Sequence, residues 1–297
     1  MSEAQEKVER ELPPYVESRL KKLSSSLKIP MENLVEEYWR FFYSDRIQKN
    51  PSLKDDEERH AYAIRVFWIR HVAKPPSKEF IVIPFGYVET RISKTTNTPI
   101  SRIYVMLYTE DKKLEKSVII CRGLQADLWK DIELFMVYRV RLFSTDGVLI
   151  ATNDTEFREP KSLNMDPLDF LRRYVGVKMF KLKDVYKNLS RKQGQYVDEF
   201  DIKAIDAIVI RSATGKRPDG TNWAFYVVSD DSVGPEEEVD EEGRIIPTQF
   251  TVWVPSSLAK YAEDSELILY GTVQLNKDNI PFMNAIGLIP VHPIRLL

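Results

Sequence analysis

Cysteine and long apolar runs are almost missing from this sequence of 297 residues. Its one cysteine, Cys121, cannot form a disulfide framework, which favours a reducing, intracellular compartment. The sequence has no run of the roughly 18 apolar residues that a transmembrane helix needs, and its charged N-terminus precedes no apolar stretch. We therefore expect a cytoplasmic protein with no signal peptide and no membrane span.

Histidine and the sequence motifs of enzymes are also scarce. The three histidines lie at unrelated spacings, so no metal-ligand cluster is expected. No glycine-rich phosphate loop, dinucleotide-binding turn, nucleophile elbow or zinc-protease helix occurs. The carboxylate pairs Asp230 with Asp231 and Asp154 with Glu156 follow strand ends, where acidic turn residues are common. These absences predict a protein without catalysis, cofactor or catalytic metal.

An excess of positive charge is missing as well. The 43 basic side chains face 45 acidic ones, which gives a formal net charge of −2. This balance excludes a uniform basic coat for duplex nucleic acid. A bound polyanion would have to be held by a local patch.

Residues 202–290 show the clearest structural pattern. Apolar and polar residues alternate there as in half-buried strands, and turns rich in glycine, proline, asparagine and aspartate separate the runs. We expect a short helix at 256–262, capped by Ser256 or Ser257. The predicted strands lie at 202–210, 223–228, 250–254, 266–275 and 280–289. Three strands, a helix and two strands are the order of an OB-fold, a small five-stranded barrel.

The same order occurs earlier in the chain, and the two copies support each other. The first copy has predicted strands at 80–88, 103–108, 116–122, 138–143 and 148–151, with a helical turn at 125–129. Because this copy carries a complete strand set and its own helix, we expect it to fold without the rest of the chain.

Residues 14–72 have apolar residues at helical spacing, with prolines where helices begin. The predicted fold class is therefore mainly β with an N-terminal α domain, in which two OB-fold barrels follow a small helical domain in tandem. The predicted domains are a helical domain at 1–75, a first OB-fold at 79–159, a basic helical linker at 160–200 and a second OB-fold at 201–297.

The predicted linker is the most basic segment of the chain. Between residues 172 and 192, eight basic side chains face one acid, Asp184, and aromatic residues are interleaved with them. Basic side chains neutralise phosphates and aromatic rings stack on bases, so the segment is a candidate nucleic-acid contact, with a solvated helix face as the alternative. The acidic loop 236–242 would in contrast repel phosphate from its rim of the second barrel.

These features carry a resemblance to a known family. The paired barrels, the strand 116–122 followed by a short helix, and the leader segment LKIPMENLVEEY at 27–38 resemble archaeal replication protein A-type single-stranded DNA-binding proteins. The resemblance covers residues 15–290. It implies that the face formed by the second and third strands of each barrel binds single-stranded nucleic acid, and it implies roles in DNA replication and DNA repair at the nucleoid.

Carried over by position, the resemblance points to the end of each third strand. In the first barrel this place holds Arg122, where an aromatic residue is usual in the family. In the second barrel it holds Trp253 or Val254, depending on a one-residue register. A zinc-binding cysteine cluster of the kind found in some members is absent.

The candidate nucleic-acid contacts form two sets. Those in the barrels are Tyr104, Arg122, Arg139, Arg141, Phe143, Trp223, Phe225 and Trp253, and those in the linker are Arg172, Arg173, Lys181, Lys183 and Lys187. For each strand aromatic, a place in the barrel core is the alternative.

Two classes of function remain open from the sequence. The first is a module that binds single-stranded DNA or RNA, with further protein partners on the N-terminal helical domain. The second is a protein-interaction scaffold, such as an assembly factor for a replication or ribosomal complex, which the weak net charge and Arg122 favour.

Overall fold

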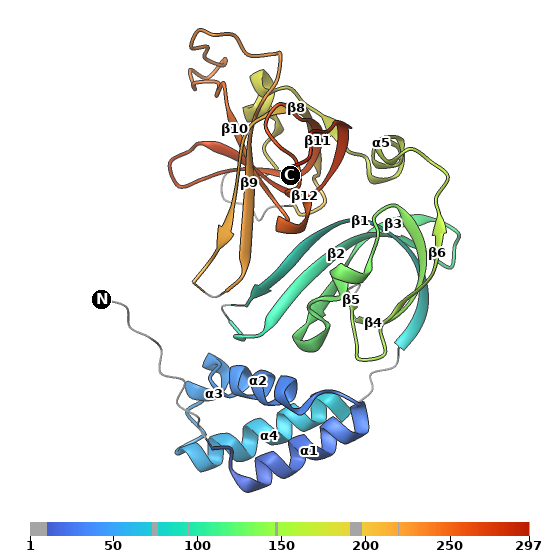
Figure 1. The fold of residues 1–297 in the computed structure, drawn as a ribbon, viewed down its shortest axis with the longest axis vertical. Coiled ribbons are helices and arrows are strands. Elements are labelled where there is room, and N and C mark those ends of the chain that lie inside the picture. Colours follow the sequence, from blue (N-terminus) through green and yellow to red (C-terminus); the bar gives the residue numbers. More distant parts are fainter. Residues whose placement is uncertain are drawn as a thin grey trace. The chain divides into compact units, whose positions relative to one another are not determined.

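A computed structural model describes residues 11–72, 77–93, 95–145, 148–190, 198–218 and 220–296. Parts of the predicted helical domain (1–10 and 73–75) and of the predicted linker (191–197) lie outside the described residues. The described chain forms two compact units: the N-terminal helices with the short segments 92–93, 95–99 and 122–124, and the remaining β-rich part. The predicted fold class, mainly β with N-terminal helices, is confirmed (Figure 1).

The helical unit has a core of its own. Its helices are α1 (Pro14–Leu27), α2 (Met31–Phe42), α3 (Asp45–Gln48) and α4 (Asp56–Val72). Prolines precede the first two helices, where the free amides of a helix start tolerate a residue without an N–H. Apolar residues at helical spacing, such as Leu20, Leu34 and Phe67, are buried together.

The first barrel is built from β1 (Ser77–Ile92), β2 (Pro99–Tyr108), β3 (Leu114–Arg122), β4 (Met136–Thr145) and β5 (Val148–Ile150). The strands pair in the order β1-β2-β3-β5-β4, and β4 closes the barrel by pairing antiparallel with β1. β3 and β5 are parallel, and two short 3₁₀ turns, Gly123–Gln125 and Leu128–Asp131, connect β3 to β4. This order and these directions are those of an OB-fold.

The second barrel repeats the arrangement, with a longer fifth strand. Its strands are β8 (Lys203–Lys216), β9 (Asn222–Ser229), β10 (Phe250–Val254), β11 (Glu266–Leu275) and β12 (Pro281–His292). They pair in the order β8-β9-β10-β12-β11, β10 and β12 are parallel, and β11 closes the barrel on β8. Inward-facing residues such as Tyr226, Val252 and Leu269 fill the barrel.

The two barrels belong to one compact unit and share a buried apolar cluster. Tyr270 of β11 is fully buried, and its hydroxyl donates a 2.6 Å hydrogen bond to the carbonyl of Phe85 in β1. A Cβ on Gly287 would lie 2.1 Å from that hydroxyl, so only glycine leaves room for the ring. A Cβ on Gly86 would lie 2.7 Å from the side chain of Ile286. Two glycines thus allow the barrels to approach closely.

The segment between the barrels contributes to both cores. It contains β6 (Phe157–Ser162), α5 (Pro167–Phe170), a π-helical turn (Leu171–Val175), β7 (Lys178–Met179) and the 3₁₀ helix η4 (Leu182–Asn188). Asp166 caps α5 by accepting hydrogen bonds from the amides of Leu168 and Asp169. Phe170, Leu171 and Val175 enter the cluster shared by the barrels, and Leu182 and Val185 pack into the core of the second barrel.

The expected helix at 256–262 differs from the structure in length and in capping. Only Ser256–Leu258 forms a 3₁₀ turn, and no serine side chain caps it. The carboxylate of Glu89, on β1 of the first barrel, takes the capping role. It accepts a 2.6 Å hydrogen bond from the Ser256 hydroxyl and a 2.7 Å bond from the amide of Ser257. The sequence could not show this cap because it comes from a residue 167 positions away.

Candidate nucleic-acid interface

Three predicted aromatic residues gather on the outer face of the second barrel. Trp223 and Phe225 project from β9 and Trp253 from β10, while their neighbours Ala224 and Val252 point into the core. The rings of Trp223 and Phe225 are stacked at 5.8 Å with an angle of 8°, and the ring of Trp253 lies 5.3 Å from Phe225. All three are half-buried. They form an aromatic platform on the second and third strands of the barrel.

The structure also settles the register that the sequence left open. Trp253 is paired with Phe225 across β9 and β10, and Val254 is buried in the core. Trp253 is therefore the aromatic residue that faces outward, because successive side chains alternate between the two faces of a strand.

The orientation of Trp223 depends on Gly215, its partner on β8. A Cβ on Gly215 would lie 2.5 Å from Cζ2 of the indole ring. The ring therefore lies directly against the backbone of β8, which holds it in place on the platform.

The platform borders a cavity of about 940 Å³ that both barrels line. Its volume is near the upper end of the range for small-ligand pockets. The second barrel contributes Trp223, Trp253, Phe282 and Asn284, and the first contributes Val88–Arg91 and Ile100–Arg102. The wall thus joins aromatic faces from one barrel to polar and charged groups from the other.

Three arginines line the cavity, and their charges are balanced to different extents. Arg102 forms a 2.8 Å ion pair with Glu199. Arg217 donates a 2.9 Å hydrogen bond to the carbonyl of Asn222, which carries no formal charge. Arg91 has no carboxylate within ion-pair distance among the described residues. Burial lowers the pKa of Arg91, and the charges of Arg217 and Arg102 lower it further. Glu89 and Tyr104 act in the opposite direction, but the net pKa is lowered.

Tyr104 lies in the wall of the same cavity but is nearly fully buried. Its ring packs against Phe85 and Phe200, and burial is the largest cause of its raised pKa. Tyr104 therefore shapes the wall and has little ring surface left on which a base could stack.

The other candidates in the first barrel do not line this cavity in the described part of the chain. Arg139, Arg141 and Phe143 occupy the outward face of β4, and Arg139 lies 3.3 Å from both Glu79 and Glu159. Arg122 is exposed at the end of β3, in the segment that belongs to the helical unit. The structure therefore brings the aromatic candidates of the second barrel together, and the three candidates on β4 lie outside the cavity that they border.

Two lysines of the basic linker are held by acidic residues of the second barrel. Lys181 forms a 2.7 Å ion pair with Asp231. Lys187 lies 3.1 Å from Glu241 and 3.7 Å from Asp184. Lys183 is exposed, and so are Arg172 and Arg173 on the π-helical turn.

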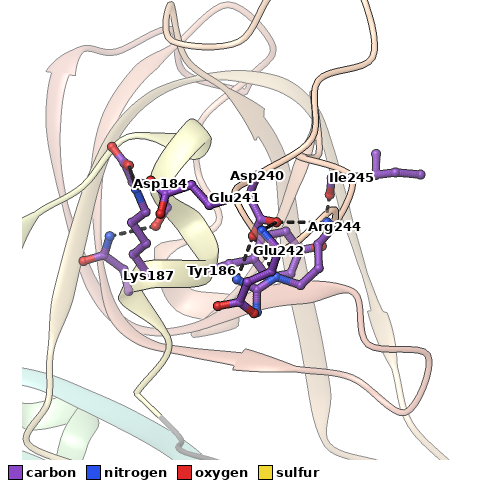
Figure 2. Close-up of polar contacts among 9 residues, drawn as sticks. Asp184, Tyr186, Lys187, Asp240, Glu241, Glu242, Arg244 and Ile245 are labelled. Atoms are coloured by element: carbon purple, nitrogen blue, oxygen red, sulfur yellow. Dashed lines mark hydrogen bonds and ion pairs between the residues drawn. The ribbon is translucent and has the colours of Figure 1, made fainter.

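The acidic loop 236–242, which supplies Glu241, is bound to η4 together with the residues that follow it, as Figure 2 shows. The Tyr186 hydroxyl donates a 3.0 Å hydrogen bond to the carbonyl of Ile245. The guanidinium of Arg244 lies 4.4 Å from the centre of the Tyr186 ring and pairs with Asp240 and Glu242. The loop and the residues after it are thus attached to η4 by an ion pair with Lys187 and by contacts with the ring and hydroxyl of Tyr186.

Sequence reasoning missed Arg91, Arg102 and Arg217. All three flank the turn between the first and second strands of a barrel, and in OB-folds this turn borders the ligand-binding face. Their position next to that turn was the one feature of the sequence that could have marked these arginines as candidate ligand contacts. Their convergence on one cavity depends on how the barrels pack, which the sequence does not reveal.

The described residues contain no group of three or more His, Cys, Asp or Glu side chains that could hold a metal ion. No helix in the described part of the chain is long and apolar enough to cross a membrane.

Comparisons with known proteins give distant likenesses. No protein-family model and no curated protein matches the chain. Among solved structures, p202 HIN1 in complex with 12-mer double-stranded DNA has 12% identity and a TM-score of 0.33, over 73% of this chain and 93% of that one. The wild-type single-stranded DNA-binding protein from Thermus aquaticus has 12% identity and a TM-score of 0.23, over 73% and 94%. A replication protein A heterotrimer bound to single-stranded DNA has 11% identity and a TM-score of 0.22, over 75% and 67%. At these scores the likenesses carry no argument about function, and the description as two OB-folds rests on strand order and pairing.

Proposed function

We propose that this protein binds single-stranded nucleic acid on the aromatic platform of its second barrel. The observation that carries the proposal is the platform of Trp223, Phe225 and Trp253, which borders a cavity lined by three arginines. Aromatic rings provide stacking surfaces for unpaired bases, and basic side chains follow the phosphate backbone. The platform also occupies the strands that OB-folds use for oligonucleotides.

Single-stranded DNA is the ligand class that we assign first, with a role in DNA replication or DNA repair. This finer assignment is supported by the resemblance of the sequence to replication protein A-type proteins. The absence of an overall positive charge supports a local contact with a single strand over a broad contact with duplex.

The test is a titration of the full chain with fluorescently labelled single-stranded DNA, single-stranded RNA and duplex DNA at two salt concentrations. We expect Trp253→Ala and Trp223→Ala each to weaken binding of the single strand by about 1–3 kcal/mol, because each removes a stacking surface. The dependence of the affinity on salt should stay nearly unchanged, because neither substitution removes a charge.

Phe143→Ala is the matched control, because Phe143 is also a half-buried strand aromatic but lies on β4, outside the cavity. An equal loss of affinity in Phe143→Ala and Trp253→Ala would contradict the platform. If the parent protein bound none of the three nucleic acids, the scaffold interpretation would replace the proposal.

A further inference from the structure

The cavity between the barrels contains positive charges from both barrels. Arg91 is the last residue of β1 that the β-rich unit includes, and Arg217 lies in the turn between β8 and β9 of the second barrel. Both line the cavity beside Trp223 and Trp253. Each barrel by itself would therefore present only one of these two guanidinium groups at the platform.

The carboxylates of the cavity are already engaged in other contacts. Glu89 accepts hydrogen bonds from Ser256 and Ser257. Glu199 is paired with Arg102, and Asp198 accepts a 2.9 Å bond from the amide of Phe200. No carboxylate of the described residues lies within ion-pair distance of Arg91 or Arg217. Among the described residues, neither arginine is thus held in an ion pair, although the charge of Glu89 acts on Arg91.

Contacts between the barrels hold the end of β1, next to Arg91, and Arg217 is held within its own barrel by its bond to the carbonyl of Asn222. Glu89, two residues before Arg91, is bonded to the 3₁₀ turn of the second barrel, and the hydroxyl of Tyr87 lies 2.8 Å from that of Ser257. These bonds attach the end of β1 to the second barrel. Both arginines line the same cavity, and the charge of Arg217 is near enough to lower the pKa of Arg91. An anion bound between them would relieve this repulsion.

We propose that Arg91 and Arg217 form a phosphate-binding site shared by the two barrels, which holds the backbone of the strand whose bases stack on Trp223 and Trp253. This inference rests on the proposed function and adds the path of the ligand. The strand leaves the platform of the second barrel and crosses to the end of β1 in the first. Guanidinium groups suit this role because their planar N–H groups match the geometry of phosphate oxygens.

The experiment compares two oligonucleotides of equal length, a single-stranded oligothymidylate with ordinary phosphodiester links and one with uncharged methylphosphonate links. Arg91→Gln, Arg217→Gln and the double variant remove the charges and keep polar side chains of similar size. With the phosphodiester strand we expect the double variant to bind about tenfold more weakly or worse. Its slope of log affinity against log salt should fall by roughly 0.7 for each phosphate contact that is lost.

With the methylphosphonate strand, the parent and the double variant should bind with equal affinity, since no phosphate charge is present to be recognised. Arg141→Gln is the control, because Arg141 is exposed on β4 and lies outside the cavity. It should match the parent with both strands.

The outcomes separate this inference from the proposed function. If the phosphodiester strand did not bind to the parent protein, both would fail. If it bound, and Trp253→Ala weakened it while the double arginine variant kept the affinity and salt slope of the parent, the shared phosphate site alone would be overturned. An equal loss of affinity for both strands in the double variant would also overturn it, because the arginines would then act on something other than phosphate.

Discussion

His71 and Glu37 form an ion pair inside the helical unit, with 3.5 Å between Nε2 and Oε2. Both side chains are largely buried, and Oε2 of Glu37 has no hydrogen-bond partner among the described residues. Nδ1 of His71 lies 2.8 Å from the carbonyl of Phe67. Burial is the largest single effect and lowers the pKa of His71. Glu37 and the Phe67 carbonyl together raise the pKa by more than burial lowers it, so the net pKa is above its usual value. The folded unit therefore favours the charged imidazolium.

This pair predicts a stability that decreases as the pH rises. A histidine whose pKa is raised by folding contributes fully below its unfolded pKa of about 6.5, and the contribution is lost as the pH rises through the folded pKa. We expect the free energy of opening of amides in α2 and α4, measured by hydrogen exchange, to fall as the pH rises above about 6.5. His71→Gln should remove this part of the pH dependence.

The matched control is His60→Gln. Burial lowers the pKa of His60, so its contribution to stability has the opposite sign and is lost as the pH falls. A pH profile for His71→Gln that equals that of the parent would contradict the role of the pair.

Single residues also show how far the sequence could lead. Alternation in the second barrel was sufficient to nominate Trp223, Phe225 and Trp253, because strand periodicity separates core from surface. It could not choose between Trp253 and Val254, since that choice requires the pairing with β9. Arg91 could not be nominated at all, because its place in the cavity follows from the packing of two barrels.

At the scale of elements, the contact between η4 and the acidic loop changes what the basic linker can offer a ligand. The composition of the segment suggested a free phosphate-binding face. The structure places Lys181 beside Asp231 and Lys187 beside Glu241, which lie 50 and 54 residues further along the chain. Composition counts charges but does not show which of them are paired across such a separation.

We therefore expect the linker lysines to add little to the binding of single-stranded DNA. Replacing Lys181, Lys183 and Lys187 together with Ala should change the salt slope by no more than replacing Lys183 alone, because the other two charges are already balanced. The measurement is the affinity of the single strand across a salt series. A slope that falls by roughly 0.7 for each of the three lysines would show instead that the ligand displaces the acidic loop.

The reciprocal variant gives an internal check on that expectation. Asp231→Asn with Glu241→Gln removes the ion-pair partners of Lys181 and Lys187 in the second barrel without changing the lysines themselves, and leaves Asp184 at 3.7 Å from Lys187. Affinity for single-stranded DNA should then rise, and the salt slope should become steeper.

At the scale of the whole β-rich part, the two barrels share one buried cluster. The sequence suggested a first barrel that folds on its own, because each copy of the strand pattern is complete. In the structure, residues from both barrels and from the π-helical turn fill the same cluster, and Tyr270 reaches across to Phe85. Separating the barrels would expose this apolar surface and leave polar groups without their partners, which opposes independent unfolding.

This arrangement predicts that the barrels unfold together. Leu142 is buried in a cluster that contains only first-barrel residues, so Leu142→Ala leaves the contacts between the barrels intact. It should cost about 2–5 kcal/mol of stability through the cavity that it creates. If both barrels open as one unit, the most protected amides of β9, β10 and β12 should lose the same free energy of opening as those of β1 and β4.

The reciprocal variant is Val252→Ala, which creates a cavity in the core of the second barrel. It should lower the protection of amides in β1 and β4 of the first barrel. Loss of protection confined to the substituted barrel in both variants would show that the barrels fold separately, as their sequence patterns alone suggest.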